Sequence, residues 1–102
     1  MRGALEFLPE AICELEEATR YYERRVSGLG VRFREEVERV CAAVVRQPLL
    51  WREQSGGFHR VNLPGFPFYI AYFIRNESIL IAAVAHASRH PDYWKQRESA
   101  DE

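Results

Sequence analysis

The residue types best suited to chemistry gather near the C-terminal end, where His86, Arg89 and Tyr93 follow a long apolar run. An imidazole can serve as a general base or acid, and a guanidinium can stabilise the charge that develops on a phosphate. A tyrosine can donate a proton or stack on a nucleic-acid base. Arg60, from an earlier alternating segment, adds a second cation. The set Arg60, His86, Arg89 and Tyr93 is therefore a candidate catalytic site for acid–base chemistry at an anionic group.

The same residues also have a purely structural interpretation. His86 can end a strand with its hydrogen bonds satisfied, and Arg89 can cap a helix or pair with Asp92. Tyr93 and Trp94 can pack a short final helix onto a sheet, as aromatic side chains commonly do. Because functional residues concentrate at exposed strand ends and loops, both interpretations stay open for His86 and Arg89.

No pattern of metal ligands, reactive cysteines or phosphate-binding glycines accompanies this set. His59 and His90 have no partner at metal-ligand spacing. Cys13 and Cys41 form no Cys-x-x-Cys pair, and we expect both to be buried thiols on helices. Gly28-Leu29-Gly30 lacks the third glycine and the preceding strand of a dinucleotide-binding loop, so it predicts a turn. The sequence predicts neither a metal nor a small-molecule cofactor.

The elements that position these residues begin with a strand and two helices. Residues 5–8 indicate a short strand, and Pro9 suits the first turn of a helix because its missing N–H would be unpaired there. Apolar residues then recur at helical spacing in two stretches. The first helix ends near Gly28, which can adopt a left-handed backbone, and the second ends before Pro48. So short a turn predicts an antiparallel helical hairpin.

An irregular segment and three strands follow the hairpin. The irregular segment carries Leu49, Leu50 and Trp51, which we expect to pack across the hairpin or under the sheet. The first strand alternates polar and apolar residues, whereas the other two are apolar on both faces, as in strands with a neighbour on each side. The predicted strands span residues 58–63, 66–74 and 79–85, with turns at 64–65 and 75–78.

This order of elements predicts an α+β fold: an N-terminal strand, an antiparallel helical hairpin, a three-stranded antiparallel meander and a short C-terminal helix. With the hairpin on one face of the sheet, the other face is left partly open. We expect Arg60, the residues after Ala85, and the pair Tyr93 and Trp94 to gather at that open face or its rim.

Length and composition indicate one folded domain. The chain has 102 residues, of which 47% are hydrophobic and 28% charged, as is typical of soluble globular proteins. We expect a single domain over residues 1–97 and a frayed acidic tail over residues 98–102. No apolar run approaches the ~18 residues of a membrane span, and Glu6 interrupts what would be the apolar part of a signal peptide. We therefore expect a cytoplasmic protein with no membrane partner.

Several segments, taken in their order and spacing, resemble the RelE/ParE toxin superfamily over nearly the whole chain. The resemblance is closest to the ParE-like, plasmid-stabilisation branch. It implies the toxin of a bacterial type II toxin–antitoxin module, held inactive by a cognate antitoxin whose gene lies beside it. The segments that carry it are Glu14-Leu15-Glu16-Glu17-Ala18, Tyr21-Tyr22-Glu23, Gly28-Leu29-Gly30 with Phe33 and Val37, Phe66-Pro67-Phe68-Tyr69-Ile70-Ala71-Tyr72, and Ala83-Val84-Ala85-His86 with Arg89 and Tyr93-Trp94.

The branches of the superfamily differ in target, and the resemblance bears on the choice. RelE-like members cleave mRNA on the ribosome, whereas ParE-like members are known for poisoning DNA gyrase. The ribonucleases resemble one another in a central-strand Tyr-Arg-Leu-Val-Tyr stretch whose arginine contacts the scissile phosphate, and Tyr69 stands at that position here. They are also strongly basic, whereas this chain has a net charge of -1 and Lys95 as its single lysine. Because binding to the ribosome is mainly electrostatic, both differences weigh against RNA cleavage.

Three functions therefore stay open at the level of the sequence. The first is a ParE-like growth inhibitor that binds DNA gyrase by surface complementarity and needs no catalytic residue. The second is a ribosome-dependent mRNA endoribonuclease, for which the resemblance makes Arg60, His86, Arg89 and Tyr93 the candidates for metal-free RNA cleavage. The third is an inactive family member that acts only through its antitoxin. For a target-binding surface, the candidate residues are Arg60, Tyr69, His86, Arg89, Tyr93 and Trp94.

Overall fold

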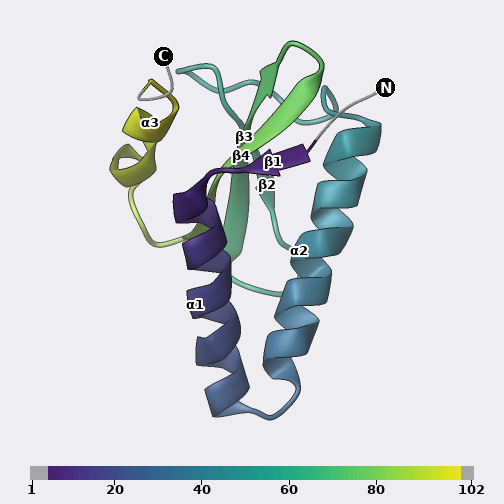
Figure 1. Ribbon diagram of the computed structural model, residues 1–102, viewed down its shortest axis with the longest axis vertical. Coiled ribbons are helices and arrows are strands. Elements are labelled where there is room, and N and C mark those ends of the chain that lie inside the picture. The colour runs from purple at the N-terminus through teal and green to yellow at the C-terminus, as the bar shows by residue number, and fades with distance from the viewer. Residues whose placement is uncertain (1–4, 100–102) are drawn as a thin grey trace.

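The computed structural model describes residues 5–99 and has the predicted α+β architecture (Figure 1). Within that range, a strand leads into a helical hairpin, three further strands form an antiparallel meander, and a short helix follows. The expected tail falls partly within the last helix, and residues 100–102 lie outside the described residues. The elements are β1 (Leu5–Phe7), α1 (Pro9–Arg25), α2 (Leu29–Arg46), β2 (His59–Asn62), β3 (Phe68–Arg75), β4 (Ser78–His86) and α3 (Asp92–Ser99).

The four strands form one sheet in the order β1-β4-β3-β2. Strand β1 runs parallel to β4, with Leu5 opposite Ile79 and Phe7 opposite Ile81, whereas the other two pairings are antiparallel. A parallel pairing requires a long crossover, and the helical hairpin with β2 and β3 supplies it. The two inner strands, β3 and β4, are the ones that are apolar on both faces, as the sequence predicted.

A β-bulge interrupts the pairing of β3 with β4. Ala71 lies opposite Ala83, but Tyr72 lies opposite Ile81, so Ala82 has no partner on β3. A bulge locally disrupts the ladder of hydrogen bonds and bends the strand that carries the extra residue. Here it leaves the carbonyl of Ala82 to accept a hydrogen bond from Arg97 Nη1 of α3 at 2.9 Å.

The helical hairpin is held closed at its turn by Glu23 and by two glycines. Gly28 has a φ of 88°, the left-handed conformation predicted for it. The Glu23 carboxylate accepts the backbone N–H groups of Gly28 and Gly30 at 2.8 and 2.9 Å, so an α1 side chain caps the start of α2. A Cβ atom on Gly30 would lie 2.5 Å from the carbonyl oxygen of Thr19, so this position requires glycine.

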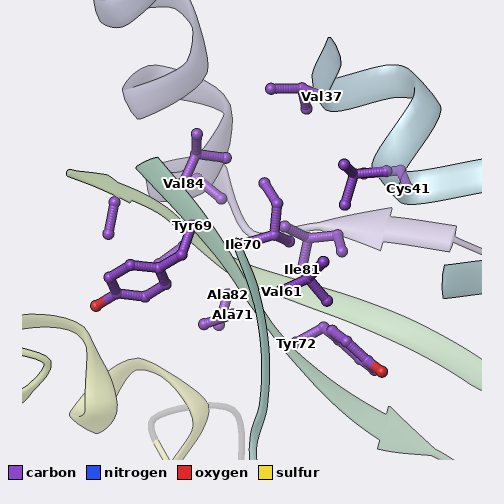
Figure 2. Close-up of a cluster of buried hydrophobic side chains, with 14 of the residues drawn as sticks. Val37, Cys41, Val61, Tyr69, Ile70, Ala71, Tyr72, Ile81, Ala82 and Val84 are labelled. Atoms are coloured by element: carbon purple, nitrogen blue, oxygen red, sulfur yellow. The ribbon is translucent and has the colours of Figure 1, made fainter. Parts of the chain in front are cut away.

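The main core lies between the hairpin and the sheet. Figure 2 shows Val37 and Cys41 of α2 above Ile70 and Ile81, with Tyr69 pointing away from the helical hairpin, to the other side of the sheet. All five side chains are buried. Cys13, which the sequence predicted to be buried, is exposed instead, because it lies on the outer side of α1.

Helix α3 covers part of the second face of the sheet through Trp94. The indole is 0% exposed, its Nε1 donates a hydrogen bond to the Tyr69 hydroxyl at 2.7 Å, and its ring meets that of Phe58 edge to face at 4.7 Å. The structural interpretation of Trp94 is therefore confirmed. Within residues 5–99, no helix is long and apolar enough to cross a membrane.

The segment between α2 and β2 differs from the prediction for two of its three large apolar residues. Trp51 is partly buried and packs against the core, as expected. Leu49 and Leu50 do not pack: their exposed fractions are 79% and 64%. A turn in which the Leu50 N–H donates to the Gln47 carbonyl directs both leucines outward.

Candidate functional site

Three of the four candidate catalytic residues line one hollow of about 360 Å³ between α1, the end of β4 and the start of α3. His86 comes from the last position of β4, Arg89 from the following turn, and Tyr93 from the first turn of α3. The α1 wall of the hollow contributes two carboxylates. The full lining is Glu14, Glu17, Ala18, Phe68, Val84, His86, Ser88, Arg89 and Tyr93.

His86 is exposed and held by its own turn. Its Nδ1 accepts the backbone N–H of Ser88 at 3.1 Å and lies 2.8 Å from the Ser88 hydroxyl. Because a backbone N–H can only donate, Nδ1 is the acceptor and Nε2 carries the proton of the neutral ring. The imidazole also meets the Phe68 ring edge to face, at 5.2 Å between centroids. His86 thus presents a fixed N–H donor at the surface of the molecule.

Glu14 is the centre of the hydrogen-bond network in this hollow, a role that the sequence did not reveal. Its Oε1 accepts the N–H of Val84 at 2.9 Å, and its Oε2 accepts the Tyr93 hydroxyl at 2.9 Å. Arg97 donates to both oxygens, at 3.2 and 2.9 Å. Strand β1 pairs with β4 only as far as Ile81. Beyond that point, Glu14 accepts the backbone N–H of Val84 and Arg97 donates to the carbonyl of Ala82.

The hydroxyl of Tyr93 donates its hydrogen bond to Glu14 within this network. Burial, and its hydrogen bond to the negatively charged Glu14, raise the pKa of the Tyr93 hydroxyl well above its ordinary value. The Arg89 guanidinium carbon lies 3.9 Å from the centroid of the Tyr93 ring, close enough for a cation–π interaction. With its proton directed at Glu14, the hydroxyl is poorly placed to act as an acid toward a ligand in the hollow.

Arg60 does not join the other candidate residues. It lies opposite Ala71 on β3, and its guanidinium carbon is 4.0 Å from the centroid of the Tyr69 ring, on the face that α3 covers. His86 pairs with Phe68, whose ring meets Phe33 of α2, so it belongs to the face of the helical hairpin. Arg60 therefore lies on the face left open by the hairpin, as expected, but the expectation that His86 gathers there with it is wrong.

Of the candidate target-binding residues, Tyr69 and Trp94 are buried, with exposed fractions of 1% and 0%. In this structure they bond to each other and cannot touch a partner directly. His86 and Arg89 are exposed, and Arg60 and Tyr93 are partly so. These four remain candidates for contact with a target.

A second hollow, of about 460 Å³, continues from the other side of His86 and Phe68 toward the end of α1. Because the two hollows share those residues, they form one groove along α1, which we call the α1 groove. The second hollow is mostly apolar, with Arg25 at its edge. It is lined by Tyr21, Tyr22, Arg25, Val26, Leu29, Pro67, Phe68 and His86. An elongated apolar groove with a charged rim is the kind of surface that binds a segment of another protein.

Comparison with known proteins identifies a family and a fold. The model of the family described as the ParE toxin of the type II toxin–antitoxin system parDE matches residues 5–91. A solved structure titled "Chromosomal ParDE TA system from P. aeruginosa" contains a chain that is similar in fold, with a TM-score of 0.72 and 13% sequence identity. The similarity covers 82% of this chain and 95% of that chain. A comparison with curated proteins finds no match.

Proposed function

Because the chain belongs to the ParE toxin family of type II toxin–antitoxin systems, we propose that it inhibits growth by binding DNA gyrase and that a cognate antitoxin neutralises it. In this proposal the toxin is not an enzyme. It acts by surface complementarity, and the surface includes His86 and Arg89 at the α1 groove.

The observation that carries this proposal is the dispersal of the residues that RNA cleavage would need. Arg60 lies on the opposite face of the sheet from His86. The hydroxyl of Tyr93 donates to Glu14 rather than to the open part of the hollow. Tyr69, at the position of the phosphate-binding arginine in the ribonuclease branch, is buried under α3. The candidate residues that remain exposed, His86 and Arg89, suit binding to a target better than acid–base catalysis.

One observation favours a second candidate function, the ribosome-dependent endoribonuclease. His86 and Arg89 line the same hollow, so an imidazole and a guanidinium are available together. General acid–base catalysis and stabilisation of a phosphate need at least such a pair. Under this alternative, His86 would be indispensable for toxicity.

The test is expression of the chain without an antitoxin in a bacterial host, comparing wild type with His86→Ala. The matched control is His90→Ala, since His90 is an exposed histidine whose ring, within residues 5–99, interacts with its neighbour Asp92 and lines neither hollow of the α1 groove. A binding mechanism predicts that His86→Ala keeps growth inhibition to within about tenfold, because one interface residue rarely carries all the affinity. Loss of toxicity by orders of magnitude in a folded His86→Ala protein, with mRNA cleavage by wild type, would establish the endoribonuclease instead.

A third outcome concerns the inactive family member. If wild type and both variants leave growth, mRNA and DNA supercoiling unchanged while the protein accumulates in folded form, the proposed growth inhibition is wrong. The chain would then act only through its antitoxin.

A further inference from the structure

Leu49 and Leu50 form a projecting apolar knob at the end of α2, remote from the α1 groove. They are the most exposed large apolar residues of the described chain, at 79% and 64%. Figure 1 shows that the end of α2 and the turn between β3 and β4 lie at one end of the molecule, and the turn of the helical hairpin at the other.

The knob is held rigidly by two buried side chains of the sheet. The Tyr72 hydroxyl donates to the Pro48 carbonyl at 2.5 Å, and His59 Nδ1 donates to the Trp51 carbonyl at 2.7 Å. The two rings stack with centroids 4.9 Å apart and an angle of 13° between their planes. The two anchored carbonyls flank Leu49 and Leu50. A preformed apolar projection loses little conformational entropy when it inserts into a partner.

A hollow of about 350 Å³ lies directly beside the knob. Pro48 and Arg46 belong to its wall, and Val45, Ile74 and Ile79 give it an apolar floor; the remaining lining residues are Asn76, Glu77 and Ser78. Its volume falls near the lower end of the roughly 300 to 1,000 Å³ range of ligand pockets. The hollow is therefore large enough to receive aliphatic side chains.

The rim of this hollow carries one charge of each sign. Arg46 and Glu77 are both exposed, and neither forms an ion pair with another residue of the described range 5–99. A knob beside a hollow, with opposite charges on the rim, is complementary to itself. Under two-fold symmetry each copy presents the same patch, so the knob of each meets the hollow of the other.

We propose that this surface is the interface of a symmetric homodimer. Leu49 and Leu50 of each copy insert into the hollow of the second copy, and Arg46 of each copy faces Glu77 of the other. Glu77 precedes His86 by nine positions along β4, about 30 Å of extended chain. Dimerisation at this end leaves both α1 grooves open. The dimer proposal can therefore be correct or wrong whether or not the chain binds gyrase.

The first measurement is sedimentation or light scattering of the purified chain from low micromolar to near-millimolar concentration. The mass is expected to double with rising concentration, and Leu49→Asp is expected to weaken association by on the order of tenfold or more. Val31→Asp is the matched control, because Val31 is 55% exposed at the opposite end of α2 and receives the same charge. A wild type that stays monomeric over the whole range overturns the proposal, as does equal weakening by the control.

A charge exchange tests the pairing of Arg46 with Glu77 directly. Arg46→Glu and Glu77→Arg are each expected to weaken homodimers, because each places like charges opposite one another. Mixing the two variants is expected to restore a dimer, since both pairs across the two-fold axis then have opposite signs. Circular dichroism confirms that each variant is folded. If both variants are folded but their mixture associates no more strongly than either variant alone, the assigned interface is contradicted.

Discussion

Glu14 shows how much a single residue can organise without leaving a sequence signal. On α1 it belongs to a run of glutamates typical of a solvated helix face. Its partners Val84, Tyr93 and Arg97 lie 70 or more positions away. No local periodicity predicts such contacts, so the network became visible only in the structure.

Replacing Glu14 with glutamine is predicted to destabilise the fold by roughly 1.5–3 kcal/mol, the usual range for hydrogen bonds to a charged group. The Arg97 side chain, only 15% exposed, loses its counter-charge. Urea denaturation measures the change. Glu17→Gln is the matched control, since Glu17 lines the same hollow but forms no hydrogen bond or ion pair with a side chain of residues 5–99. A surface substitution of that kind stays within about 0.5 kcal/mol. Equal effects of the two variants would contradict the role assigned to Glu14.

Glu23 is predicted to make stability depend on acid pH. The N–H of Gly28, followed by that of Gly30, lowers the pKa of the Glu23 carboxyl from its ordinary 4.5. A lowered pKa in the folded state stabilises the fold above the unfolded-state pKa, and this contribution is lost as the pH falls through the folded-state value. Denaturation from pH 6 to pH 3 is expected to show a shallower loss for Glu23→Gln than for wild type. Identical slopes would exclude this cap as a source of acid sensitivity.

At the scale of elements, helical spacing, turn residues and apolar runs were sufficient to predict both helices of the hairpin and the three-stranded meander. The parallel pairing of β1 with β4 was not predictable in the same way, because the two strands meet only after a long crossover. Sequence also could not decide which face Arg60 and His86 occupy. A shift of one residue in register exchanges the faces of a strand, and the bulge beside Ala71 introduces such a shift.

The exposed leucines are a further limit of sequence reasoning. Apolar character indicated burial for Leu49 and Leu50, but Tyr72 and His59 fix the neighbouring carbonyls so that both side chains face outward. Those two anchors come from other strands, and hydrogen bonds to backbone carbonyls leave no pattern in the sequence. The three groove-side candidates, His86, Arg89 and Tyr93, were predictable by residue type, whereas the burial of Tyr69 and Trp94 depended on where α3 docks.

Helix α3 is predicted to depend on Trp94 for its attachment to the sheet. Trp94→Ala removes a fully buried indole and its hydrogen bond to Tyr69, and such truncations cost about 3–5 kcal/mol. Denaturant unfolding measures this loss, and hydrogen exchange of α3 amides reports whether the helix detaches. Trp94→Phe, which keeps most of the apolar contact with Phe58, is expected to be milder. A loss below about 1 kcal/mol for alanine would contradict the close packing described for α3.

For the molecule as a whole, the fold matches that of a chain in a ParDE structure, in agreement with the family match to ParE toxins. The mechanism of action depends instead on which residues are exposed at the surface. The sheet and hairpin have the architecture of a chain in the P. aeruginosa ParDE structure although only 13% of the residues are identical. Conservation of a fold at that identity does not carry over a target, because function depends on specific surface residues. The α1 groove and the hollow beside the knob formed by Leu49 and Leu50 share no lining residue, so target binding and self-association can be measured separately.

The most direct test of the proposed mechanism is a DNA supercoiling assay with purified gyrase and this chain, run beside a ribosome-dependent mRNA cleavage assay with the same preparation. Binding to gyrase predicts that supercoiling falls as the chain is added and that mRNA stays intact. His86→Ala is expected to keep inhibition to within about tenfold. Undisturbed supercoiling together with cleaved mRNA would contradict the account and assign the chain to the ribonuclease branch.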